Sequence, residues 1–186
     1  MSGTTIMGLV KLFFKLDRAN LDNKLYDYRL ALQDNNLEEA ERLLWIHLDK
    51  YVSDEVALCE LAVILKGKGQ VNEAIKLLER AVKAHASYAG SRYQLGKLYL
   101  EKSDFSSAET YLHSAFSMSQ TSDYSYHLAV AHRGLNDIKK SVHYLKKAIK
   151  LDKSNKNAYA MLIEIYKLLG KDNESEKYQL LLDQIC

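Results

Sequence analysis

Turn-forming residues recur at an almost constant interval along this 186-residue chain. Asn35, Gly69, Ser103, Asn136 and Gly170 follow one another at intervals of 34, 34, 33 and 34 residues, and each stands between two segments whose apolar residues have helical spacing. A fixed interval of this size is typical of repeat proteins, in which every repeat adds one supersecondary unit to a common core. The period therefore predicts five helix-turn-helix units that follow one another along the chain.

Small residues recur with the same period. Three sets share spacings of 12 and 7 residues: Ala62, Ala74 and Ala81; Gly96, Ala108 and Ala115; and Ala129, Ser141 and Ala148. Small side chains at a helix crossing let the two backbones approach to about 8 Å. The chain also has no Pro and only 8 Gly, so few of its residues interrupt a helix. We therefore predict an all-α chain whose paired helices cross at these small residues.

The pattern of apolar residues sets the expected helix boundaries. The expected helices are 21–33, 37–50, 54–66, 71–83, 88–101, 105–117, 122–133, 138–150, 155–169 and 173–185.

The segment GSRYQLGKLYLEKSDFSSAETYLHSAFSM resembles the tetratricopeptide repeat (TPR), because it carries that family's Leu95-Gly96 pair, Tyr99, Ala108 and Ala115. The resemblance covers residues 21–186 as a single solenoid, and it implies a TPR-type helix-turn-helix solenoid wound as a right-handed superhelix. The repeats are expected at about 21–54, 55–88, 89–121, 122–155 and 156–186.

The terminal repeats depart from the family pattern. Tyr28 and His47 in the first repeat, and Ile163 and Leu182 in the last, stand where the family has small residues. The Pro that usually ends each repeat is absent throughout.

In the TPR family the first helix of each repeat lines a groove that holds an extended or helical peptide. Matching each first helix to residues 90–101 gives the peptide-binding groove candidates Leu25, Arg29, Cys59, Val63, Lys66, Tyr93, Lys97, Tyr126, Val130, Arg133 and Lys167, with Glu164 among the acidic neighbours. These residues suggest a protein ligand with apolar or aromatic anchors and some acidic groups. Tyr93 and Tyr126 are either its main contacts or part of the core. Cys59 is either reactive or, as we expect, a partly buried inert thiol.

No catalytic, cofactor or metal motif emerges, and we predict that the chain is not an enzyme and needs no cofactor. The KGKG stretch at residues 66–69 lacks the spacing of a phosphate-binding loop. His127 and His132 are five residues apart, about 140° around a helix, so they cannot clamp one metal from one face. Two cysteines suggest a reducing compartment, and we expect a cytoplasmic location with membrane-peripheral association as an alternative.

Residues 1–20 form an apolar segment with three alternative roles. It is expected to cap the first repeat as a helix, but docking to a partner or lying in a membrane interface are alternatives. At the other end, Leu180, Leu181 and Ile185 are expected to remain partly exposed, which would favour self-association.

Lysines are concentrated in one segment, KKSVHYLKKAIKLDKSNK. Lys139, Lys146, Lys150 and Lys153 lie along one helical stripe, whereas Asp152 is the only acid in the segment. The stripe is either a solvated outer surface or a contact for an anionic lipid, nucleic acid or acidic partner.

The sequence thus predicts a non-catalytic protein-binding module that serves as an adaptor, assembly scaffold or chaperone. The alternative is a membrane-peripheral structural protein that self-assembles through its apolar N-terminus and C-terminal helix. A homo-oligomer is compatible with either prediction. Nucleic acid is disfavoured by a formal net charge of only +2, and a membrane surface is a minor partner.

Overall fold

The structure is a computed structural model that describes residues 27–34 and 36–185. The N-terminal segment 1–20, Leu25 and Asn35 lie outside the described residues. Within them the chain is all-α, and no β-strand occurs. A helical segment at 27–33 is followed by α2 (Leu37–Lys50), α3 (Glu55–Gly67), α4 (Val71–Ala84), α5 (Ala89–Glu101), α6 (Phe105–Met118), α7 (Ser122–Gly134), α8 (Ile138–Leu151), α9 (Lys156–Leu168) and α10 (Asp172–Asp183).

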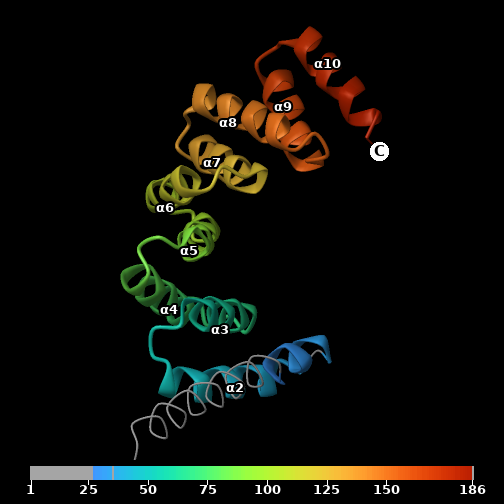
Figure 1. The fold of residues 1–186 in the computed structure, drawn as a ribbon. Helices are drawn as coiled ribbons and strands as arrows, with labels where there is room; N and C mark the ends of the chain where they lie inside the picture. The colour runs from blue at the N-terminus through green and yellow to red at the C-terminus, as the bar shows by residue number, and fades with distance from the viewer. Residues whose placement is uncertain (1–26, 35, 186) are drawn as a thin grey trace, which may run out of the picture. The chain divides into compact units, whose positions relative to one another are not determined.

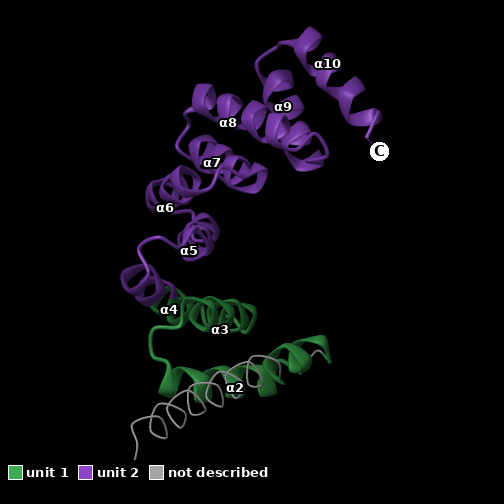
Figure 2. Cartoon of the chain, in the orientation of Figure 1, with its two compact units in different colours: residues 1–77 green, residues 78–186 purple. Residues whose placement is uncertain are grey.

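The chain divides into two compact units, residues 1–77 and 78–186, and the division falls within α4 (Figure 2). In unit 1, α2 packs against α3. In unit 2, three helix pairs follow one another: α5 with α6, α7 with α8, and α9 with α10 (Figure 1). Contacts of α6 with α7 and of α8 with α9 join these pairs into a solenoid, as the sequence predicts.

The four periodic turn residues that the structure describes adopt a left-handed backbone conformation. The φ angles are 80° at Gly69, 59° at Ser103, 60° at Asn136 and 65° at Gly170. The N–H of the next residue donates to a carbonyl five positions earlier: Gln70 to Leu65 at 2.9 Å, Asp104 to Tyr99 at 2.9 Å, Asp137 to His132 at 2.8 Å and Lys171 to Tyr166 at 2.9 Å. This six-to-one bond defines the Schellman motif, which ends a helix and satisfies its last carbonyls. The 34-residue period therefore marks helix ends whose geometry is set locally.

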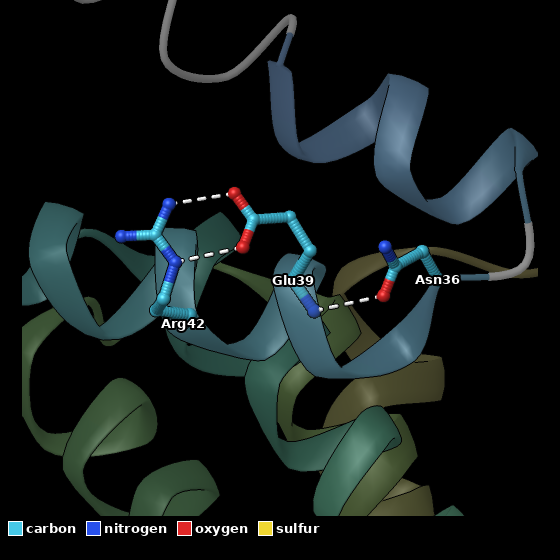
Figure 3. Close-up of polar contacts among 3 residues, drawn as sticks. All are labelled: Asn36, Glu39 and Arg42. Atoms are coloured by element: carbon cyan, nitrogen blue, oxygen red, sulfur yellow. Dashed lines mark hydrogen bonds and ion pairs between the residues drawn. The ribbon is translucent and has the colours of Figure 1, made fainter.

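Side-chain caps begin several of the helices, whereas α5 and α10 have no side-chain cap bond. Asp104 accepts from the N–H of Ser107 at 3.1 Å, and Asp137 accepts from the N–H of Lys140 at 3.0 Å. In α2, Asn36 accepts from the N–H of Glu39 at 3.1 Å (Figure 3). Such N-caps satisfy backbone donors that have no partner inside the helix.

The small residues of the repeat lie where paired helices touch. A Cβ added to Gly96 of α5 would lie 2.6 Å from Cγ of Leu112 on α6. In the next pair, the Ser141 hydroxyl of α8 donates to the Ala129 carbonyl of α7 at 2.9 Å. Backbone proximity at these positions explains the 12-residue spacing, because the first small residue of each set lies on one helix of the pair and the second, 12 residues later, lies on the other.

Leucines fill the space around these crossings. Leu61, Leu95, Leu128 and Leu162 of the first helices are 0% exposed, and Leu44, Leu78, Leu112 and Leu145 of the second helices are at most 1% exposed.

The departures in the first repeat are also buried. Tyr28 and His47 are each 3% exposed. His47 Nε2 lies 2.8 Å from Oδ2 of Asp54, and its ring stacks obliquely on Tyr51 at 4.9 Å. A buried polar contact therefore replaces the usual small residue at this helix crossing.

Candidate functional site

The predicted groove residues fall into both units. Arg29, Cys59, Val63 and Lys66 belong to unit 1, whereas Tyr93, Lys97, Tyr126, Val130, Arg133 and Lys167 belong to unit 2. In unit 1, Val63 is 45% exposed and Arg29 is exposed, but Cys59 is only 9% exposed and offers a ligand little surface. Lys66 is half-buried near the end of α3.

The unit 2 candidates lie on three successive first helices. We call the set Tyr93, Lys97, Tyr126, Val130, Arg133, Glu164 and Lys167 the first-helix face; its members come from α5, α7 and α9. Most are half-buried, whereas Glu164 and Lys167 are exposed.

An aromatic cluster joins α5 to α7. The ring of Tyr93 stacks on Tyr124 with centroids 4.4 Å apart and meets the edge of His127 at 5.3 Å. His127 also lies edge-on to Tyr126, with ring centroids 5.1 Å apart. The Nζ of Lys97 lies 5.2 Å from the Tyr93 ring centroid, which is within cation-π range. The cluster thus offers aromatic surface and a positive charge together.

Hydrogen bonds fix the imidazole of His127 within this cluster. Its Nδ1 lies 2.8 Å from the carbonyl oxygen of Asp123 and 3.2 Å from the hydroxyl of Tyr93. Because a carbonyl oxygen only accepts, Nδ1 carries the proton and donates to Asp123. Burial lowers the pKa of His127, and the nearby Lys97 charge adds to this effect, against the opposing influence of Asp123. The ring is therefore neutral at physiological pH.

Tyr93 remains a neutral hydroxyl over a wide pH range. Burial, with the adjacent Asp123 charge and Tyr124, raises the pKa of Tyr93 to about 12. Burial also raises the pKa of Tyr126, although Arg133 opposes this shift. Both phenols therefore retain a hydrogen-bond donor for a ligand.

A second cross-repeat contact joins α7 to α9. Arg133 Nη1 lies 3.0 Å from Glu164 Oε2, and Nη2 lies 2.5 Å from Oε1, which makes a bidentate pair. Their side chains are 35% and 53% exposed, so the pair contributes at most about 1 kcal/mol to stability. Arg133 is therefore already engaged, and an acidic ligand group would compete with Glu164 for it.

Sequence reasoning missed two members of this cluster. Tyr124 was not a candidate, and His127 was considered only as a metal ligand. Tyr93 contacts His127, the residue that follows its own repeat equivalent, Tyr126. A sequence period aligns equivalent positions of successive repeats. The side chains that touch across neighbouring repeats, such as Tyr93 and His127, are at non-equivalent positions, so the period does not reveal them.

A depression of about 380 Å³ lies between the helical segment 27–33 and α2. Its lining residues are Asp27, Leu30, Ala31, Asp34, Asn36, Glu39, Arg42 and Leu43. Figure 3 shows that Arg42 is held by Glu39, with Nη2 2.6 Å from Oε1 and Nε 2.7 Å from Oε2. Among the groove candidates that the structure describes, none lines this depression.

Over residues 27–34 and 36–185, no group of three or more His, Cys, Asp or Glu side chains is arranged to hold a metal ion. None of the helices in this part of the chain is both long and apolar enough to cross a membrane. His132 is buried, with 3% of its surface exposed, and its ring stacks on Tyr144 with centroids 5.3 Å apart, so it is part of the core.

Comparison with known proteins identifies the class that this fold defines. Two family profiles, both described as tetratricopeptide repeat, match residues 65–131 and 122–155. The chain is a tetratricopeptide-repeat protein. Proteins of this class are generally non-catalytic protein-interaction modules, so the fold supports a protein partner.

Solved structures share the fold at low sequence identity. MamA from Desulfovibrio magneticus RS-1 matches with a TM-score of 0.79 and 16% identity, covering 88% of this chain and 93% of that one. PilF from Pseudomonas aeruginosa matches with a TM-score of 0.81 and 17% identity, covering 89% and 76%. YrrB, described as a TPR protein with an unusual peptide-binding site, matches with a TM-score of 0.68 and 17% identity, covering 76% and 74%. A search of curated protein sequences finds no significant match.

Proposed function

We propose that this protein is a non-catalytic adaptor, assembly scaffold or chaperone that binds a peptide segment of another protein on the first-helix face. The observation that carries the proposal is the aromatic cluster of Tyr93, Tyr124 and His127, which joins α5 to α7 beside Lys97. Aromatic side chains that are half-buried and already held in place lose little conformational entropy when a ligand covers them. We place this function in a cytoplasmic, reducing compartment, in line with the two cysteines of the chain.

The charges of the face indicate the kind of segment that would bind. Lys97 and Lys167 supply positive charge, whereas Glu164 is paired with Arg133. A ligand carboxylate near Lys97 would find both a cation and two phenolic donors, and an apolar anchor would cover the Tyr93 and Tyr126 rings. We therefore expect a segment with an aromatic or aliphatic anchor flanked by an acidic residue.

The test compares two kinds of aromatic loss. The wild-type chain and a Tyr93→Ala, Tyr126→Ala variant are used to capture partners from the native cell, and the captured proteins are identified by mass spectrometry. A Tyr111→Ala variant is the matched control, because Tyr111 of α6 stacks on Tyr99 at 5.5 Å and lies outside the first-helix face.

We expect the double variant to lose partners that the control retains, while circular dichroism shows equal helicity in both. Equal capture by all three proteins would show that binding takes place elsewhere. A Lys97→Gln variant should weaken capture without altering the aromatic packing, which separates ligand contact from loss of structure.

Self-assembly is the second candidate function, and exposed leucines favour it. Leu168 at the end of α9 is 75% exposed, and Leu180 of α10 is 64% exposed. Sedimentation over a concentration series, with Leu168→Gln, Leu180→Gln as the comparison, tests this candidate. A wild-type chain that stays monomeric at all concentrations would exclude it.

A further inference from the structure

The outer surface of α8 differs in charge from the equivalent surfaces of the neighbouring second helices. Four of its exposed positions form a stripe that we call the lysine strip: Lys139, His143, Lys146 and Lys150. The equivalent exposed positions are Ser106, Thr110, His113 and Ser117 on α6, and Asn173, Lys177, Leu180 and Gln184 at α10. The ends of the strip are 11 residues apart in sequence, about 16 Å along the helix at 1.5 Å per residue. Lys153 extends it into the following loop.

The carboxylates near the strip do not neutralise it. Asp137 pairs with Lys140, which lies off the strip, with Nζ 3.3 Å from Oδ2. Asp152 accepts from the N–H of Ser154 at 2.8 Å and from its hydroxyl at 2.6 Å. Over the part of the chain that the structure describes, Lys139, Lys150 and Lys153 form no ion pair with an acidic side chain. Their charges are therefore available to a partner.

Lys146 has a different environment from the other strip lysines. Its Nζ lies 5.8 Å from the ring centroid of Tyr166 on α9, and the carboxylate of Glu174 on α10 attracts it electrostatically. It adds positive charge to the strip, but its contacts with α9 and α10 also make it part of the packing. Variants that test binding should therefore leave Lys146 unchanged.

Three features of the surface distinguish between classes of anionic partner. Apart from His143, the basic residues between positions 138 and 156 are all lysines, and none is an arginine. Lysine suits contact with a diffuse array of negative charges better than bidentate recognition of individual phosphates or carboxylates. Apart from the His143 ring, the strip has no exposed aromatic side chain on which bases would stack, and it has no Phe, Tyr or Trp. Leu151, 44% exposed, stands next to Lys150, but a single apolar residue at the end of the strip does not form the buried cluster that anchors a protein interface.

We propose that the lysine strip and Lys153 dock the protein on an anionic lipid surface through charge complementarity. A bilayer that contains acidic lipids presents mobile negative charges to all four lysines at once, and it needs neither an apolar pocket nor a matched sequence. Lys139, Lys146 and Lys150 lie on one side of α8, and Lys153 is in the loop that follows it. A bilayer surface that approaches this side can therefore come within the Debye length of about 10 Å of these charges at the same time. This surface is on α8, whereas the first-helix face comes from α5, α7 and α9.

The test uses the full chain and vesicles of phosphatidylcholine with or without phosphatidylserine. The strip variant is Lys139→Gln, Lys150→Gln, Lys153→Gln, and the control variant is Lys76→Gln, Lys83→Gln, Lys102→Gln at three exposed lysines elsewhere. Both variants lower the net charge by three, so a difference between them reports position rather than total charge. Glutamine is a good helix former, and thermal melts check that both variants remain folded.

We expect binding to phosphatidylserine vesicles at low salt and not to neutral vesicles. Each lysine near an acidic bilayer contributes about 1 kcal/mol, or about five-fold in affinity, so the strip variant should bind about 100-fold more weakly. The control variant should lose much less.

Three outcomes would overturn the proposal. The first is no binding of the wild type to acidic vesicles, and the second is equal loss of binding in the two variants. The third is binding of poly-glutamate or duplex DNA through the strip when vesicles do not bind, which would assign the surface to an acidic protein or a nucleic acid. If the strip variant binds acidic vesicles as tightly as the control variant does, the contact with the membrane lies elsewhere, for example in residues 1–20.

Discussion

Substitution of Gly96 by alanine tests the close approach of α5 and α6 on which the repeat packing depends. The added Cβ would lie 2.6 Å from Cγ, 2.8 Å from Cδ2 and 3.3 Å from the backbone nitrogen of Leu112. Leu112 is 0% exposed, so its side chain cannot move toward solvent, and relief of the backbone contact requires the two helices to separate.

The magnitude follows from two opposing effects. Overpacking a core of this kind costs about 1 to 3 kcal/mol, and the backbone contact favours the upper half of that range. Alanine recovers about 1 kcal/mol because glycine is a poor helix former. We therefore expect Gly96→Ala to lower the free energy of unfolding by about 1 to 2 kcal/mol, which is a fall in melting temperature of about 2 to 8 °C for a chain of this length.

Gly67→Ala is the matched control for this substitution. Gly67 is the last residue of α3, and a Cβ added there meets nothing within 4 Å. It should leave stability unchanged or raise it by up to about 1 kcal/mol. Thermal and urea unfolding followed by circular dichroism measure both variants. If Gly96→Ala were as stable as Gly67→Ala, the two helices would not be held together at this position, and the packing explanation of the small residues would fail.

Three further predictions concern polar contacts. Asp54→Ala should cost about 1 kcal/mol at neutral pH by removing the N-cap of α3 and the contact with His47. Burial raises the pKa of Asp54, but hydrogen bonds from the Ala57 N–H and His47 have the larger, opposite effect, so the folded pKa lies below the ordinary value. The stabilisation by Asp54 is therefore fully present above the unfolded pKa of about 3.9 and is lost as the pH falls through the folded pKa. Urea unfolding of both proteins between neutral and acidic pH checks the trend. Ser141→Ala should cost about 1 kcal/mol, because it removes the buried bond to the Ala129 carbonyl; an unchanged melting temperature would contradict this assignment. His127 has a folded pKa below its ordinary value of about 6.5, so acidification below that pH should destabilise the wild type more than a His127→Gln variant, as measured by melting temperature against pH.

Much of the fold is predictable because its signals are local. Ser103 and Asn136 mark helix ends that the structure places at positive φ, and both are polar residues of the kind used in turns. The predicted boundaries of α2 match the structure at both ends, and those of α3 to α10 lie within two residues. Asn155 and Asp54 were assigned to helices but serve as N-caps, which is the usual ambiguity at a helix start.

The candidate site was only partly predictable. The resemblance to the TPR family selects the first helices, and the structure shows Tyr93 and Tyr126 beside the same imidazole. The contribution of Tyr124 and the pairing of Arg133 with Glu164 depend on contacts between residues 31 or more positions apart. Such contacts depend on how adjacent repeats are rotated against each other, and a period in the sequence does not specify that rotation.

The sequence by itself determined the repeat, the helix ends and the small residues at the crossings, because turn chemistry, capping and packing volume act over a few residues or between helices joined by one short turn. The tertiary structure decided which side chains meet across repeats. It buries Cys59 to 9% exposure and places the Tyr93 hydroxyl 3.2 Å from Nδ1 of His127. It also leaves Lys139 and Lys150 of α8 exposed, with no ion pair to an acidic side chain among the described residues. These outcomes depend on the orientation of whole helices, which is set by the sum of many packing contacts rather than by any one residue.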